Sequence, residues 1–288
     1  MNLNRRERLV PYLLILPFLL SFLLFFLIPS VYSFLLSFAK YPGYGDVKWV
    51  QFSNYSNILK YARFWEALRR TIFYWLVKFA PVTILSFLSA VCIHSRLMNR
   101  ANRLYKPMLF LPQICATVAT SLVFQVILAK KSGVINQLLG TEIGFIDNKT
   151  LSQYSVLLMM CWRAIGWYMV VYLAGLTTIS DEINDAALID GCNAWSKMLY
   201  ITIPMMRQTF MFAFIMDAIG SLRIFTEPAV LTGTENLATQ NAEGVINLLM
   251  MNIKGGNFGM ASAYGWIVFV LIFAVSTMLL RLFKEREE

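Results

Sequence analysis

The sequence predicts an all-α membrane protein with six transmembrane helices and with both termini in the cytoplasm. Hydrophobic residues make up 58% of its 288 residues and charged residues only 14%, whereas soluble domains are about 45–50% apolar. The apolar residues gather in six runs long enough to cross a bilayer. Basic residues are about twice as dense in the segments assigned to the cytoplasm as in those assigned outside, which favours this orientation although Lys60, Arg63, Arg69 and Arg70 fall in the first outside loop.

The first apolar run covers residues 9–38 and follows the basic stretch at residues 4–8. Such a stretch stays in the cytoplasm, so the N-terminus is expected inside. The run exceeds the core of a secretory signal peptide and lacks a small-x-small cleavage site. We therefore expect it to remain as the first span and to end near residues 26–30, with room for an amphipathic extension to about residue 39. Residues 41–70, which are polar and rich in aromatics, should lie outside and complete an N-terminal region of residues 1–70.

Five more runs should form a helical core over residues 71–288, which contains the cytoplasmic loop 181–204. The expected spans are residues 71–93, 107–128, 155–178, 205 to about 225, and 259–282. Arg96, Arg100, Arg103 and Lys106 place the loop after the second span inside, and the charged residues 284–286 end the chain inside. Residues 129–154 and 227–257 are expected outside.

Four charged side chains fall within or at the edge of these spans: Lys78, Arg163, Asp217 and Arg223. Each costs about 2.5–3.5 kcal/mol at the centre of a bilayer, so each should face a cavity or a partner. At about 1.5 Å rise per residue, Arg163 and Asp217 both lie about 12–13 Å from the outer ends of their spans. We therefore expect these two side chains to pair, either as part of a substrate path or as a staple between two spans. Lys78 is expected to snorkel to the outer interface.

Aromatic side chains accompany these charges, namely Trp162, Trp167 and Tyr168. Aromatic faces with polar tips suit a sugar, which presents apolar C–H faces and hydroxyl edges, so these residues and Arg223 join the substrate-path candidates. Trp and Tyr near helix ends also serve as bilayer anchors, and this alternative stays open. Further polar candidates are Gln113, Gln125, Asn247 and Tyr264.

The polar segment at residues 181–204 separates two apolar spans and should fold as helix, turn, helix. Gly191 follows the first helical pattern, where a left-handed helix end is sterically cheap. Asn193 can cap the second helix, and Pro204 can end it while suiting the first turn of the next. Taken alone, this pattern also fits an amphipathic connector without a partner.

The same segment resembles the EAA-type signature loop of bacterial ABC importer permeases: an acidic residue, two alanines, three residues, a glycine, nine residues and Ile-x-Leu-Pro. Asp185 stands where the family has the longer glutamate, and Ile203 is a conservative variant. The residues that the resemblance assigns to docking on an ATPase are Asp185, Ala186, Ala187, Asp190, Gly191, Trp195, Ile201 and Pro204.

Three outer segments are also similar to this family, and in particular to its maltose, multiple-sugar and glycerol-phosphate permeases. They are the Phe-x-Asn-Tyr of residues 52–55, the Phe-Trp-x-Ala-Leu of residues 64–68 and the Gly-x-Ile-Asn of residues 133–136. The family's Gly-Gly-Pro after the fifth span is replaced by Thr-Gly-Thr-Glu at residues 232–235.

The resemblance implies a type I ABC importer permease, half of a carbohydrate pathway in the bacterial cytoplasmic membrane. Its expected partners are a second homologous permease, two ATPase subunits that bind ATP and Mg²⁺, an extracytoplasmic sugar-binding protein and the lipid bilayer. Import is driven by ATP hydrolysis on the ATPases, and this chain does no chemistry.

The residues themselves agree with a chain that is not an enzyme. It contains no Gly-x-x-x-x-Gly-Lys-Ser/Thr loop for ATP. The only histidine, His94, follows a span and reads as solvated, and the four cysteines show no metal-like spacing and are expected as free thiols. The net charge of +9 is scattered along the ends of the spans, which favours lipid headgroups over nucleic acid.

Three alternatives remain open from the sequence. One is an ABC permease for another small polar solute. Another is an energy-independent channel or secondary carrier, which should show coupling-ion residues or a broken-helix pair, and the sequence shows neither clearly. The last is a membrane scaffold that binds partners through the same loop without transport.

Overall fold

The structure, a computed structural model, describes residues 5–95, 102–233 and 239–284, with side chains over 12–95, 104–233 and 241–281. Some residues named above lie outside the described side chains. They are the basic stretches at residues 4–8, 96–103 and 284–286, and residues 234–235, which stand where the family has Gly-Gly-Pro. The chain divides into two compact units. Unit 1 holds residues 1–62 and 248–269, and unit 2 holds residues 63–247 and 270–288.

Unit 1 begins with one long helical segment made of α1 (Arg5–Phe22), the π-helical turn η1 (Leu23–Leu27) and α2 (Ile28–Leu36). A short antiparallel ribbon follows, in which β1 (Ala39–Lys40) pairs with β2 (Lys48–Trp49). The unit is completed by α3 (Ser53–Lys60) and by residues 248–269, which belong to α15 (Val245–Lys254) and α16 (Phe258–Lys284). The first helical segment therefore reaches Leu36, past the expected end of the span near residues 26–30 and within the amphipathic extension that the sequence allows to about residue 39.

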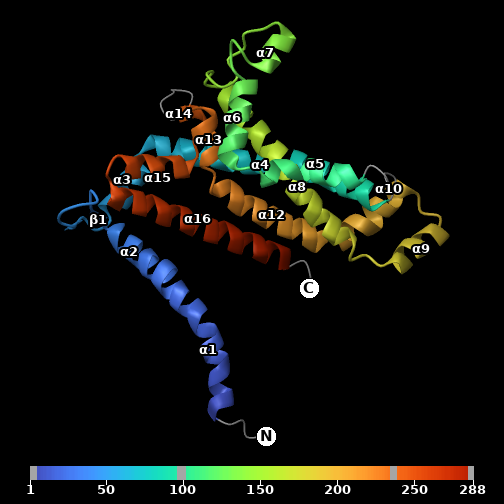
Figure 1. Cartoon of the computed structure of the whole chain (residues 1–288), viewed down its shortest axis with the longest axis horizontal. Helices are drawn as coiled ribbons and strands as arrows, with labels where there is room; N and C mark the ends of the chain where they lie inside the picture. The colour runs from blue at the N-terminus through green and yellow to red at the C-terminus, as the bar shows by residue number, and fades with distance from the viewer. Residues whose placement is uncertain (1–4, 96–101, 234–238, 285–288) are drawn as a thin grey trace. The chain divides into compact units, whose positions relative to one another are not determined.

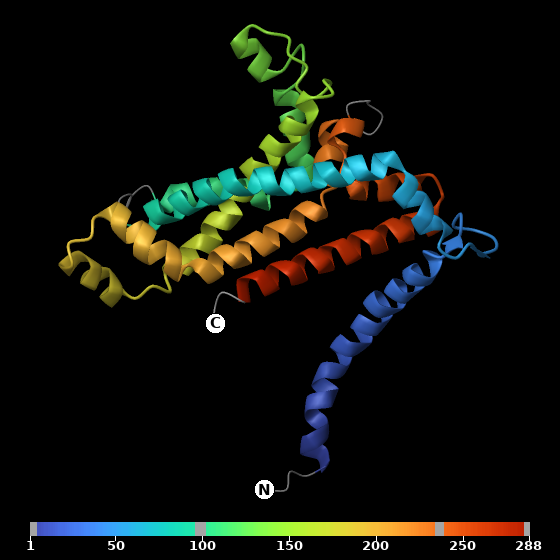
Figure 2. The same ribbon diagram turned by 180° about the vertical axis from the view of Figure 1, so that it is seen from behind.

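Unit 2 is a helical bundle built around the long helices α4 (Ala62–His94), α8 (Leu151–Leu176) and α12 (Arg207–Leu222) (Figure 1). Figure 2 shows α12 alongside α4 from the opposite side. The shorter elements are α5 (Asn102–Ile114), α6 (Thr117–Ile127), α7 (Val134–Leu139), α9 (Asp181–Ile189), α10 (Ala194–Lys197), η2 (Met198–Thr202), α11 (Ile203–Met205), α13 (Thr226–Leu231) and α14 (Thr239–Ala242).

Four helices in the described part are long and apolar enough to cross a membrane: Tyr12–Leu36, Ala62–His94, Leu151–Leu176 and Phe258–Arg281. Two bent pairs raise this number to six if each pair is one span. The pair Leu104–Ile114 and Thr117–Ile127 bends by 98°, so the third expected span is not one continuous helix. The break lies where Ala116 is extended, with ψ of 132°, just beyond the helix-breaking Pro112.

The second bent pair, Ala194–Met205 and Arg207–Leu222, bends by 66°. We expected Pro204 to end the first of these helices, but the helix continues through Pro204 and breaks at Met206. The π-helical turn η2 ends two residues before Pro204, and η1 ends two residues before Pro29. A proline has no N–H, so one carbonyl of the preceding turn lacks its helical hydrogen bond. A π-helical turn, with hydrogen bonds between residues five apart, changes which carbonyl that is, and the helix can continue past the proline.

Two asparagines from the family-like motifs organise loops by hydrogen bonding to the main chain. In unit 1, Asn54 donates to the carbonyl oxygens of Ser37 and Ala39, at 2.9 Å each. In unit 2, Asn136 donates to three carbonyls and accepts from the amide N–H of Ile143 at 3.0 Å. Both asparagines are buried. The motifs thus satisfy main-chain groups that a loop would otherwise leave unbonded.

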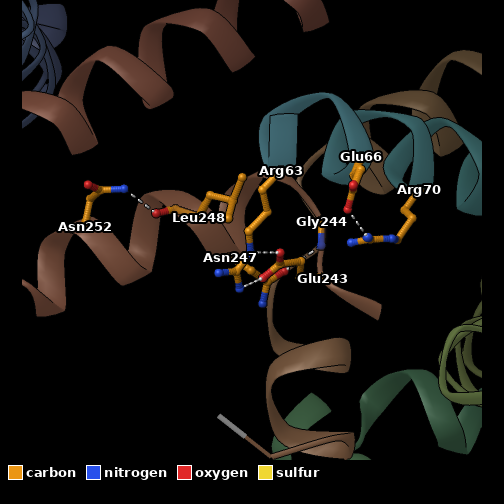
Figure 3. A network of polar contacts seen from close by, with 8 residues as sticks. All are labelled: Arg63, Glu66, Arg70, Glu243, Gly244, Asn247, Leu248 and Asn252. Carbon is orange, nitrogen blue, oxygen red and sulfur yellow. Dashed lines mark hydrogen bonds and ion pairs between the residues drawn. The ribbon is translucent and has the colours of Figure 1, made fainter. Parts of the chain in front are cut away.

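An ion pair joins the start of α4 to the segment between α14 and α15 (Figure 3). Arg63 donates from Nε and one terminal nitrogen to both oxygens of Glu243, at 2.5 and 2.8 Å. Glu243 is 1% exposed, and its neighbour Gly244 donates its N–H to Oδ1 of Asn247 at 2.9 Å. The Tyr74 hydroxyl donates to the carbonyl of Ala242 at 2.8 Å. Residues 242–247 are therefore fixed on α4 by charge-assisted hydrogen bonds.

Close packing of α8 on α5 depends on Gly166. A Cβ at this position would lie 2.0 Å from the carbonyl oxygen of Leu109, which is main chain and cannot turn aside. The two helices approach so closely only because position 166 has no side chain.

We expect Gly166→Ala to lower the free energy of unfolding by about 1–3 kcal/mol, because it overpacks a backbone contact. Equilibrium unfolding in detergent would measure the effect. Gly220→Ala is the matched control, because a Cβ at Gly220 meets nothing within 4 Å and alanine favours a helix. Equal loss of stability in both variants would contradict the packing role of Gly166.

Candidate functional site

A cavity of about 330 Å³ lies in unit 2 between α4, α8 and α12. We call it the charged cavity, because five acidic or basic side chains line it together with Gln113, Trp167 and Tyr168. The five are Lys78, Arg163, Asp217, Arg223 and Glu227.

The structure corrects the predicted pairing of Arg163 with Asp217. The ammonium nitrogen of Lys78 lies 2.9 Å from Oδ1 of Asp217, and a guanidinium nitrogen of Arg163 lies 3.1 Å from Oε1 of Glu227. The prediction rests on the similar depths of Arg163 and Asp217 along their spans. Depth does not determine how each helix is rotated about its axis, so it does not determine which side chains face each other. The chain also turns at Phe225, with φ of −144°, and α13 brings Glu227 back to α8 from a segment expected to be an outside loop.

Lys78 is the residue that sequence reasoning placed least well. It was expected to snorkel to the outer interface, but its side chain is 8% exposed and that of Asp217 is 1% exposed. A charge so deeply buried needs a partner of opposite sign, because desolvation costs several kcal/mol per ion. The isolated Lys on an apolar helix and the isolated Asp on another were the only sequence signals for this pair.

Five of the six substrate-path candidates line the charged cavity, and Trp162 does not. Trp162 packs on Phe124, with ring centroids 5.3 Å apart, and is 43% exposed. On a helix, Arg163 and Trp167 share a face four residues apart, whereas Trp162 is rotated by about 100° from Arg163. Helical periodicity thus separates it from the others.

The loop at residues 181–204 forms the predicted helix, turn, helix. Gly191 has φ of 74°, and its N–H donates to the carbonyl of Leu188 while that of Cys192 donates to Ala187. This pair of bonds is the Schellman arrangement, which ends a helix with a left-handed residue. The side chain of Asn193 then accepts from the N–H of Ser196 at 2.7 Å and caps α10 as expected.

Most of the predicted docking residues face outward on this loop. Ala187 is buried and Ile201 is partly exposed. The other six are exposed, namely Asp185, Ala186, Asp190, Gly191, Trp195 and Pro204. Sequence reasoning missed three large apolar side chains here, Leu188, Ile189 and Tyr200, which are 65%, 86% and 78% exposed. Such a cluster of exposed apolar groups is typical of an interaction surface.

A second cavity, of about 740 Å³, lies beside this loop and reaches the ends of α4 and α8. Asp185 and Trp195 line it together with His94. The described residues contain no group of three or more His, Cys, Asp or Glu side chains that could hold a metal ion. The four cysteines are free thiols, as predicted.

Comparison with known proteins decides the family. Residues 82–286 match the family described as binding-protein-dependent transport system inner membrane component. The chain belongs to this family. It is therefore a membrane-embedded transport component of an ABC system and not a catalytic subunit.

Relatives of this permease include named sugar transporters. It is 29% identical to the arabinooligosaccharides permease AraP of Bacillus subtilis, over 96% of this chain and 89% of AraP. It is 28% identical to the lactose permease LacF of Rhizobium radiobacter, over 91% and 90% of the two chains. It is 25% identical to the trehalose/maltose permease MalF of Thermococcus litoralis, over 100% and 98%.

Among solved structures, a bacterial ABC transporter that imports the acidic polysaccharide alginate has the same fold. Its chain superimposes with a TM-score of 0.87 at 18% identity, over 98% of this permease and 96% of that chain. At this identity the likeness establishes the shared fold and not the substrate.

The pairing of charges in the cavity can be tested by double-mutant cycles. We expect Lys78→Met or Asp217→Leu alone to cost about 3–5 kcal/mol of unfolding free energy, because each leaves a buried charge unpaired. The double variant Lys78→Met with Asp217→Leu should lose clearly less unfolding free energy than the sum of the two single losses. Equilibrium unfolding in detergent would measure all three values.

The matched control is the pair Glu66 and Arg70, one turn apart on α4, in which the glutamate side chain is 53% exposed and the coupling should be about 0.3–0.5 kcal/mol. A larger coupling between Arg163 and Asp217 than between Lys78 and Asp217 would contradict the observed pairing.

Proposed function

We propose that this permease forms one half of the pathway of an ATP-driven carbohydrate importer in the bacterial cytoplasmic membrane. Both bent helix pairs count as spans, which gives six spans with both termini in the cytoplasm. The other subunits are a second homologous permease, two ATPase chains that bind ATP and Mg²⁺, and an extracytoplasmic binding protein. The relatives named for arabinooligosaccharides, lactose and trehalose/maltose support a carbohydrate substrate, and a solved alginate transporter in complex with a periplasmic protein supports the external partner.

The observation that carries the proposal is the exposed loop between two spans. Its helix, turn, helix places acidic and apolar side chains outward around Gly191, and its second helix continues through Pro204 to the start of α12. A partner that grips this loop can therefore pull directly on α12, which lines the charged cavity with Asp217. Closure of the ATPases on ATP would rock the spans between inward-open and outward-open states as rigid bodies.

The long first helix supports membrane assembly. The apolar stretch from Tyr12 to Leu36 has none of its most apolar window buried within this chain. Exposing so much apolar surface to water is unfavourable by about 25 cal/mol per Å². Lipid, or another permease chain within the bilayer, must cover it.

Gly191→Val tests the docking role. We expect it to reduce co-purification of the ATPase from membranes and sugar uptake several-fold, because a branched residue resists the left-handed conformation that shapes the loop. Membrane insertion should be unchanged. Affinity purification with the proteins encoded beside it, followed by ATPase assay, would measure the effect.

Gly140→Val is the matched control, because Gly140 also has positive φ and open space around it, and ends α7. It should keep the ATPase bound. A second variant, Trp195→Ala, should cost little stability, because the side chain that it removes is 69% exposed. Its control is Trp49→Ala, which removes a 64% exposed side chain outside the loop. Unchanged ATPase binding in both Gly191→Val and Trp195→Ala would overturn the docking role.

A further inference from the structure

The charged cavity carries more positive than negative charge. Lys78, Arg163 and Arg223 face only two carboxylates. Each carboxylate is already matched, Asp217 by Lys78 and Glu227 by Arg163. Within the part of the chain that the structure describes, no carboxylate oxygen lies within 4.0 Å of the Arg223 guanidinium. Among the described residues, one cation at the cavity is therefore left without a matching carboxylate.

Arg223 stands where a solute would first meet it. It caps the end of α12 and is exposed, whereas Asp217 lies six residues earlier on the same helix and is buried. At about 1.5 Å per residue, these positions are separated by about 9 Å along the helix axis. The free cation thus lies at the open end of the cavity and the Lys78–Asp217 pair at its buried end.

Two buried polar atoms beside the cavity also lack a protein partner. Among the described residues, neither Oδ2 of Asp217 nor Nε of Arg163 has a hydrogen bond. One is an acceptor and the other a donor, and buried polar groups are normally bonded. A hydroxyl group can donate to the first and accept from the second, so a polyhydroxylated solute satisfies both.

From the free cation and the two unbonded atoms, we infer that the carbohydrate moved by this permease carries an anionic group, which Arg223 binds. A guanidinium offers two parallel N–H groups and so binds a carboxylate in a bidentate manner, as on a uronic acid, or a phosphate. The sugar hydroxyls then bond Asp217 and Arg163 deeper in the cavity. The inference rests on the proposed function and names the substrate class of the same site.

The test is uptake into liposomes that contain this permease with its partner permease and ATPases, supplied with its binding protein. The probes are uronate oligosaccharides of several linkages, each paired with the neutral sugar made from it by carboxyl reduction, and a hexose phosphate. We expect at least one acidic probe to enter about tenfold faster than its neutral counterpart, equivalent to about 1.4 kcal/mol. Faster uptake of a uronate would identify the bound group as a carboxylate, and faster uptake of the hexose phosphate would identify it as a phosphate.

Arg223→Gln should lower uptake of the acidic probe about tenfold and change uptake of a neutral sugar less than twofold, and Arg223→Lys should restore part of the loss. Arg69→Gln is the matched control, because Arg69 is exposed on α4 and does not line the cavity. Uptake of neutral sugars alone, or equal loss of both probes in Arg223→Gln, would overturn the inference and leave the importer intact. Absence of uptake for every probe would overturn the proposed function with it.

Discussion

The ion pair between Lys78 and Asp217 is the contact on which the unit 2 bundle most depends. Both side chains are almost fully removed from solvent, and either one alone would leave a buried charge whose desolvation costs several kcal/mol. The pair therefore holds α4 and α12 in one register. A polar cavity can then exist among apolar helices, because its buried charges are matched and, of its charged side chains, only the exposed Arg223 has no described carboxylate within 4.0 Å.

Main-chain hydrogen bonding sets the second constraint. In a bilayer every N–H and C=O must be bonded within the protein, so prolines in a span have to be accommodated. At Pro29 and Pro204 the chain does this with a π-helical turn that ends two residues before the proline, whereas Pro81 lies inside α4 without such a turn. As a result the loop helix extends to Met205 and meets α12 at a single break. Under the proposed function, a displacement at Trp195 would thereby reach the helix that carries Asp217.

The sequence predicts what depends on local pattern and misses what depends on distant contacts. Hydrophobic runs locate the helices, and Gly191 and Asn193 specify the turn and cap of the loop, because both act on neighbouring main-chain groups. The partner of Asp217 could not be derived, since depth along a span does not determine helix rotation. Likewise Arg63 and Glu243 are 180 residues apart, and nothing near either predicts their pairing. Whether the cavity residues contact substrate, and whether residues 1–70 and 71–288 act as separate regions, stay predictions.

The central claim is that ATP hydrolysis on a partner drives solute through this permease. The most direct measurement is the ATPase rate of the complex purified with its encoded neighbours and placed in lipid, with the binding protein either empty or loaded with each of a panel of sugars. The account predicts that one loaded binding protein stimulates hydrolysis well above the empty one. A folded and correctly inserted permease with no associated ATPase would contradict it and favour a carrier or a scaffold.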